Sequence, residues 1–219
     1  MPNFIQFLLV PILLCSCAMA AFAQKGLDQI NINGQFLIAA RVGNVERVTA
    51  LLLEGAKVNS RDRDGNSPLN IAANKGNTAL VEVLLKADAD ANLANLAGVT
   101  PLMAASFGAS PQIVRKLLTA RASIDPLDRV KKNAATYAAA KGCAECLSEL
   151  MRAGTQVNAL LENDLTLLMW AAAYGHDAAV RLLLAEGANR ALKDSRGKSA
   201  VDMAREGSHD SVVALLSTP

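Results

Sequence analysis

Residues 62–69 read Asp62-Arg63-Asp64-Gly65-Asn66-Ser67-Pro68-Leu69, and the second half of this motif returns as Gly98-Val99-Thr100-Pro101-Leu102. The glycine recurs at Gly197, and 33-residue steps from Gly98 (98, 131, 164, 197) pass through Lys131 and Asp164 on the way. A fixed period of this length indicates one supersecondary unit that is stacked many times. The period therefore predicts an elongated architecture in which each unit contacts its neighbours.

Each unit carries a signal for the start of a helix, two residues after the step point. The residues there all have a short side-chain oxygen that can accept from a free backbone N–H: Ser67, Thr100, Asn133, Thr166 and Ser199. Pro68 and Pro101 follow the first two, at a position where proline is favoured. Small residues such as Ala72-Ala73 come next and predict a first helix that lies close to its neighbours.

A second helix is predicted in every unit, because apolar residues recur at i, i+3 and i+4. The four full units carry Val81/Leu84/Leu85, Val114/Leu117/Leu118, Leu147/Leu150/Met151 and Val180/Leu183/Leu184. An earlier copy, 33 residues before the first full unit, has Val48/Leu51/Leu52 at the same positions. The last copy has Val213 and Leu216. The units are closed at the same spacing by Asn59, Asn92, Asp125 and Asn158.

These motifs, together with Leu182-Leu183-Leu184-Ala185-Glu186-Gly187-Ala188, resemble ankyrin repeats. The resemblance covers about residues 35–219 and implies an all-α solenoid of about six stacked repeats, each with two antiparallel helices and a short β-hairpin finger. The repeats are expected at about 35–60, 61–92, 93–125, 126–158, 159–190 and 191–219.

The sequence departs from the family pattern at several points. The histidine that the family places after Thr-Pro-Leu is replaced by Asn70, Met103, Thr136 and Met169. The repeat at 126–158 is the most degenerate, with Val130-Lys131-Lys132-Asn133-Ala134-Ala135 in place of Gly-x-Thr-Pro-Leu. We therefore predict that this repeat is the weakest joint of the stack.

An uncharged stretch from Phe4 to Ala23 precedes the repeats. Ala21-Phe22-Ala23 before Gln24 fits a secretory cleavage site, which predicts a signal peptide over 1–23 and an N-terminal linker over 24–34. Two alternatives stay open, a bacterial lipobox at Leu14-Cys15-Ser16-Cys17 with Cys17 acylated and a retained membrane anchor. All three predict an exported protein, periplasmic or secreted or anchored facing that compartment, with membrane contact only if the leader is retained or Cys17 is lipidated.

Cys143 and Cys146 are the cysteines outside this stretch, and they form Cys-x-x-Cys at the start of a second helix. In an oxidising compartment this spacing suits a local structural disulfide. The alternative is two free thiols with no special role. A regulatory redox pair is a third interpretation, since a helix start lowers thiol pKa values. A metal site would need two more ligands, and the two histidines, His176 and His209, both lie at the repeat position of Cys143.

Catalysis is not expected. No Ser-His or Cys-His arrangement is suggested, and Gly197-Lys198-Ser199 lacks the earlier glycine of a phosphate-binding loop, where Leu192 stands. Tyr137 and Trp170 share one slot of the first helix and are predicted to be core residues. A net charge of +2 with 19% charged residues gives no strong basic field, so nucleic acid is not an expected partner. We expect no cofactor, no metal and no small-molecule substrate.

Stacking aligns equivalent positions into columns, and ankyrin proteins, by resemblance, use the concave face for protein recognition. The residues predicted to bind a partner there are Arg63, Asp64, Asn66, Asn74, Lys75, Leu96, Val99, Phe107, Arg129, Lys132, Lys141, Glu162, Leu165 and Tyr174. For Leu96, Val99 and Leu165, packing against neighbouring fingers is the alternative. Two hypotheses follow, a non-catalytic protein-binding scaffold and a redox-responsive accessory factor that uses Cys143 and Cys146.

Overall fold

The computed structural model describes residues 31–217. The predicted signal peptide, its cleavage after Ala23 and the lipidation of Cys17 lie outside the described residues. Residues 31–34, which we predicted as the end of a linker, already belong to a helix over 31–42. The reason is packing, because Phe36 is fully buried and Ile32 packs against the core.

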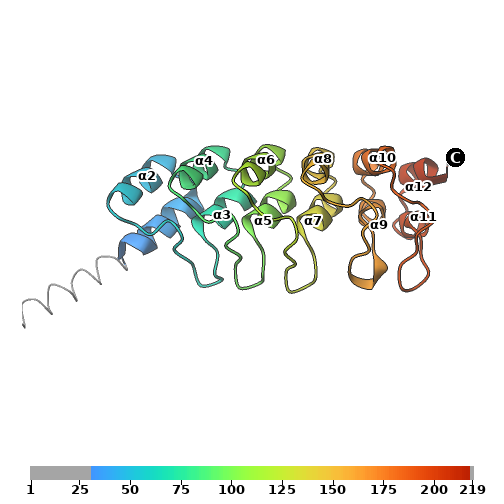
Figure 1. The fold of residues 1–219 in the computed structure, drawn as a ribbon, viewed down its shortest axis with the longest axis horizontal. Helices are drawn as coiled ribbons and strands as arrows, with labels where there is room; N and C mark the ends of the chain where they lie inside the picture. Colours follow the sequence, from blue (N-terminus) through green and yellow to red (C-terminus); the bar gives the residue numbers. More distant parts are fainter. Residues whose placement is uncertain (1–30, 218–219) are drawn as a thin grey trace, which may run out of the picture.

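Two layers of antiparallel helices follow one another in chain order along the stack (Figure 1). The inner layer contains the helix over 31–42 and then α3 (Pro68–Asn74), α5 (Pro101–Phe107), α7 (Ala134–Ala140), α9 (Leu167–Ala173) and α11 (Ala200–Glu206). The outer layer contains α2 (Val45–Leu53), α4 (Thr78–Lys86), α6 (Pro111–Thr119), α8 (Ala144–Arg152), α10 (Asp177–Ala185) and α12 (Asp210–Ser217). This arrangement confirms the predicted all-α solenoid.

The inner helices begin where the sequence predicts. Ser67, Thr100, Asn133, Thr166 and Ser199 are all N-caps, and each side chain accepts a hydrogen bond from the backbone N–H three residues later. Each such cap contributes roughly 1 kcal/mol. These caps fix the register of the inner layer, and with it the spacing of every column on the surface.

The core lies between the layers and between successive repeats. Small inner-helix residues such as Ala72, Ala105, Ala138 and Ala171 are fully buried, so that neighbouring inner helices approach closely. The outer helices contribute the i, i+3 stripe, with the leucines of each stripe completely inaccessible to solvent: Leu84, Leu117, Leu150 and Leu183. Burying each leucine contributes roughly 1.5–3 kcal/mol.

The fingers are turns, and the predicted β-hairpin strands are not formed within residues 31–217. Each finger is closed by two backbone bonds, such as Asp62 N–H to Asn66 O and Gly65 N–H to Asp62 O, both at 3.0 Å, which is too short a ladder for strands. The isolated bridge between Lys193 and Ser199 is the nearest approach to a sheet. Residues Glu162–Asp164 form a short 3₁₀ turn (η1) instead.

An aspartate or asparagine side chain organises most fingers. Oδ1 of Asp62, Asn95, Asp128 or Asp194 accepts from the backbone N–H groups two and four residues later. Leu161 occupies this position in the remaining finger, 161–165, and cannot accept such bonds. That finger is therefore the one that adopts the 3₁₀ turn, with Asn163 and Asp164 both at positive φ.

The repeat at 126–158 lacks two hydrogen bonds that recur between other adjacent repeats of residues 31–217. Between other adjacent fingers a backbone bond links one finger to the next, as from Leu96 N–H to Asp64 O at 2.9 Å, but none of the described residues forms it between 128–132 and 161–165. Asn59, Asn92 and Asn158 each accept from a backbone N–H of the following repeat, whereas Asp125 has no such bond. These differences support the prediction of a weak joint, which stays a prediction.

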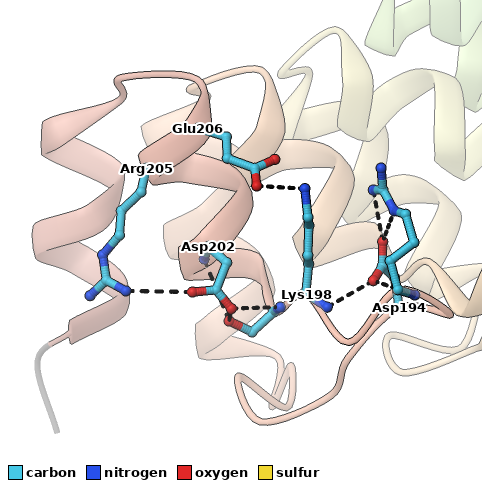
Figure 2. A network of polar contacts seen from close by, with 7 residues as sticks. Asp194, Lys198, Asp202, Arg205 and Glu206 are labelled. Carbon is cyan, nitrogen blue, oxygen red and sulfur yellow. Dashed lines mark hydrogen bonds and ion pairs between the residues drawn. The ribbon is translucent and has the colours of Figure 1, made fainter.

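The last repeat is held by a polar network around Asp194 (Figure 2). The Asp194 carboxylate is buried, accepts from the N–H groups of Arg196 and Lys198, and pairs with the Arg196 guanidinium at 2.8 Å. Lys198 also pairs with Glu206 on α11. Burial alone would raise the pKa of Asp194, but the hydrogen bonds from Lys198 and Arg196 outweigh it and lower that pKa.

We predict that Lys131→Gly stabilises the protein by about 1 kcal/mol. Lys131 has φ of 60° at a position where Gly65, Gly98 and Gly197 also have positive φ. A non-glycine residue in this region costs on the order of 1–3 kcal/mol, part of which the extra unfolded-state freedom of glycine offsets. Chemical unfolding measures the change. Lys131→Ala is the control, and an equal gain in that variant would assign the effect to lost charge instead.

We also predict that Asp194→Asn reduces the sensitivity of the protein to acid. Because the folded-state pKa of Asp194 lies below its ordinary value of 3.8, the ionised carboxylate stabilises the fold above that value. That stabilisation is lost as the pH falls through the folded-state pKa. Thermal melts should therefore show a difference between wild type and Asp194→Asn that is largest above about pH 4 and shrinks below it. A difference that is constant with pH would contradict this.

Candidate functional site

Equivalent inner-helix positions form two columns beside the fingers, in which the larger side chains are exposed or partly buried and Ala104 is buried. One column contains Ile38, Ile71, Ala104, Tyr137 and Trp170, each 33 residues after the one before (38, 71, 104, 137, 170). The next contains Val42, Lys75, Gly108, Lys141 and Tyr174 at the same step (42, 75, 108, 141, 174). The solenoid therefore presents a continuous edge that crosses several repeats.

A groove of about 650 Å³ lies between this edge and the fingers, from Arg41 to Tyr137. We call it the finger groove. Of the residues predicted to bind a partner, it is lined by Asp64, Asn66, Asn74, Lys75, Val99 and Phe107. Its N-terminal end is polar, because Arg41 pairs with Asp62 at 3.0 Å and Lys75 Nζ donates to the backbone oxygen of Arg41 at 2.6 Å. Burial would raise the pKa of Asp62, but bonds from Asn66, Asp64 and Arg41 lower it.

Beyond the groove, aromatic rings and lysines alternate along the stack. Phe107 meets Tyr137 edge to face at 5.9 Å between centroids, and Trp170 stacks on Tyr174 at 6.1 Å. Lys141 Nζ lies 4.1 Å from the Phe107 centroid, and Lys132 Nζ lies 4.6 Å from the Trp170 centroid and 5.8 Å from that of Tyr137. These distances are within the range of cation–π attraction. We call this set, Phe107, Lys132, Tyr137, Lys141, Trp170 and Tyr174, the cation–aromatic row.

The centre of the row is anchored by a buried carboxylate. The Tyr137 hydroxyl donates to Oδ2 of Asp128, which is itself buried and accepts from the N–H groups of Val130 and Lys132 through Oδ1. Burial and the bond to Asp128 both raise the pKa of Tyr137, so the phenol stays protonated and keeps donating. Tyr137 thus ties the finger 128–132 to α7.

The structure places the predicted partner-binding residues in two groups. Those exposed to solvent are Arg63, Asp64, Asn74, Lys75, Leu96, Phe107, Arg129, Lys141, Glu162 and Tyr174. Those partly buried are Asn66, Val99, Lys132 and Leu165. Val99 and Leu165 pack against the core, which is the alternative given for them above, whereas Leu96 lies against Gly65 of the neighbouring finger and stays exposed.

Tyr137 and Trp170 pack against the core, as predicted, but are only partly buried, and one edge of each ring also contributes to the cation–aromatic row. The sequence analysis did not single out Ile38 in the same column, 64% accessible, or Val42 in the next, 76% accessible.

Cys143 and Cys146 are joined by a disulfide in the structure, with their Cα atoms 5.2 Å apart. Cys143 is the N-cap of α8, and its sulfur accepts from the N–H of Cys146, which is fully buried. At the equivalent N-cap position His176 and His209 instead contact the preceding repeat, through Nε2 to the backbone oxygens of Ala140 and Ala173 at 2.9 and 3.1 Å. The histidines therefore act in stacking.

Within residues 31–217, no group of three or more His, Cys, Asp or Glu side chains could hold a metal ion. None of the helices described is both long and apolar enough to cross a membrane.

The sequence matches the family of ankyrin repeats, in units of three copies, over residues 36–129 and 134–218. The chain belongs to the ankyrin-repeat family. It is also 37% identical over 95 residues to the E3 ubiquitin-protein ligase hecd-1 of Caenorhabditis elegans. That match covers 42% of this chain and only 4% of the relative, so it carries no activity to this protein. Ankyrin repeats act as protein-binding scaffolds, which agrees with a surface site made of columns.

We predict that Tyr137→Phe lowers the free energy of unfolding by about 1.5 kcal/mol, because it removes a hydrogen bond to a charged, buried carboxylate. Tyr174→Phe is the matched control, since the Tyr174 hydroxyl has no hydrogen-bond partner among the described residues and its loss should change little. Denaturant unfolding of both variants measures the difference. Equal losses would show that the bond to Asp128 contributes nothing specific.

Proposed function

We propose that this ankyrin-repeat protein is a non-catalytic scaffold or accessory protein that binds another protein through the finger groove and the cation–aromatic row. The observation that carries the proposal is the row itself. Every aromatic side chain of residues 31–217 other than the buried Phe36 belongs to it. Exposed aromatic side chains with a polar rim are typical of the energetic centre of protein interfaces.

The compartment is part of the same proposal. An exported location, periplasmic or secreted, is supported by the uncharged stretch from Phe4 to Ala23 and by the small residues before Gln24. The bond between Cys143 and Cys146 is compatible with an oxidising compartment. The redox-responsive alternative gains no specific support. Cys146 is fully buried, and the disulfide constrains only the start of α8.

We predict that Phe107→Ala combined with Tyr174→Ala weakens binding of the native partner at least tenfold. Phe107 is 46% and Tyr174 53% accessible, and covering such a side chain at an interface is worth roughly 1.5–3 kcal/mol. The partner is first captured from the native compartment with the full chain and identified, and its affinity is then measured for each variant.

Leu53→Ala on α2 is the matched control, because Leu53 is an apolar residue that is 86% accessible and lies far from the row in sequence. It should leave the affinity unchanged. Helical content and the unfolding midpoint should stay close to those of wild type in all variants. A collapse of stability in the double variant would assign Phe107 and Tyr174 to the core, and unchanged affinity would place the partner on another face.

A further inference from the structure

We propose that the cation–aromatic row binds an extended segment of the partner that carries neighbouring aspartate or glutamate residues, with their carboxylates on Lys132 and Lys141. The inference rests on the proposed function, and it adds the chemistry of the partner. Three observations support it. Lys132 and Lys141 form no ion pair with a carboxylate of residues 31–217, their ammonium groups lie over aromatic rings, and the row continues into the finger groove.

No carboxylate of residues 31–217 pairs with Lys132 or Lys141, whereas ion pairs of 2.5–3.5 Å engage other cations: Arg41, Arg47, Arg115, Lys116, Arg152, Arg196, Lys198 and Arg205. Other exposed lysines of that range, such as Lys57 and Lys86, have no ion pair either, so what distinguishes Lys132 and Lys141 is that their ammonium groups lie over aromatic rings. The nearby Asp128 accepts from Tyr137 and from two backbone N–H groups, and it forms no ion pair with either lysine. Arg129 and Lys131 on the same finger are also exposed and without ion pairs in that range.

Glu162 is an acidic side chain close to the positive charges of this finger. It lines a small hollow together with Lys131, Lys132 and Trp170, but forms no ion pair with either lysine. Positive charge therefore remains in excess around the row, even though the chain as a whole has a net charge of only +2.

The aromatic rings hold the ammonium groups without using their hydrogen-bond donors. A lysine ammonium has three donors, and a ring face beneath it satisfies the charge but leaves donors for an incoming oxygen. The exposed Phe107 lies beside the Lys141 ammonium, whereas the Lys132 ammonium lies over the partly buried Trp170, on which the exposed Tyr174 stacks. This alternation suits a segment in which carboxylates alternate with apolar side chains.

The finger groove gives the rest of the segment its place and its direction. Phe107 and Tyr137 belong to both the groove and the row, so one extended chain can follow both. Asn74 in the groove is exposed, and its amide has no hydrogen-bond partner among the described residues, which suits contact with a peptide backbone. At the far end of the groove Asp64 and the Arg41–Asp62 pair lie beside Lys75, whereas the ammonium groups that rest on aromatic rings, those of Lys132 and Lys141, lie toward α7 and α9, and we place the acidic residues there.

The test begins with selection of short random peptides on the immobilised full chain. The most enriched peptide and its counterpart with Asn and Gln in place of Asp and Glu are then titrated, with the fluorescence of Trp170, the single tryptophan, as readout. We expect the acidic peptide to bind at least tenfold tighter than its amide counterpart. Added salt should weaken its binding, because exposed charges are screened.

Two pairs of substitutions separate local contact from overall charge. Lys132→Gln combined with Lys141→Gln should lower the affinity for the acidic peptide at least tenfold and leave the affinity for the amide peptide unchanged. Lys57→Gln with Lys86→Gln removes the same charge from exposed lysines outside the row and should have little effect. Equal affinity of the two peptides, enrichment of basic or neutral peptides, or absence of any enriched peptide would each overturn the inference.

Phosphate-bearing ligands are the competing outcome. Tighter binding of single-stranded DNA or of vesicles rich in phosphatidylglycerol through the same two lysines would also overturn it. If the native partner is lost on substitution of Phe107 and Tyr174 but not on substitution of Lys132 and Lys141, the proposed function stands and the acidic segment alone is rejected.

Discussion

Close packing of the inner helices is the constraint on which the rest of the structure depends. Fully buried alanines such as Ala72, Ala105, Ala138 and Ala171 hold successive inner helices at short range. The larger outer-helix leucines then fill the space behind them. Because every repeat is set against the last in the same way, residues 33 positions apart come into line. The groove and the cation–aromatic row are consequences of that alignment, since neither involves a specialised loop.

The aspartate and asparagine side chains inside the fingers decide which fingers have the same shape. Where Asp62, Asn95, Asp128 or Asp194 accepts the N–H groups of its own finger, the finger has a fixed shape. Leu161 cannot do this, and its finger is the irregular one. Asp128 serves a second purpose, because its other oxygen positions Tyr137. One buried carboxylate therefore contributes both to the fold and to the candidate site.

Much of the fold was predictable because it depends on local signals at a fixed period. The N-caps at Ser67, Thr100, Asn133, Thr166 and Ser199 were each predicted and each found. The β-hairpin strands expected in the fingers do not form within residues 31–217, since the two backbone bonds that close each finger do not extend into a ladder. In the candidate site, exposure of Phe107 and Tyr174 followed from their place at the end of a short helix. Tyr137 and Trp170 pack against the core as predicted, but their second contact, with Lys132 from a finger, depends on the tertiary structure and could not be derived from helix periodicity.

The absence of a backbone bond between the fingers 128–132 and 161–165 bears on how the surface is used. The cation–aromatic row crosses the boundary between these two fingers, with Phe107 and Tyr137 on one side and Trp170 and Tyr174 on the other. The joint predicted to be the weakest of the stack therefore lies within the proposed binding surface. A ligand that spans the row contacts both sides of that boundary and restricts bending there. Binding at this surface and the flexibility of the stack are therefore coupled.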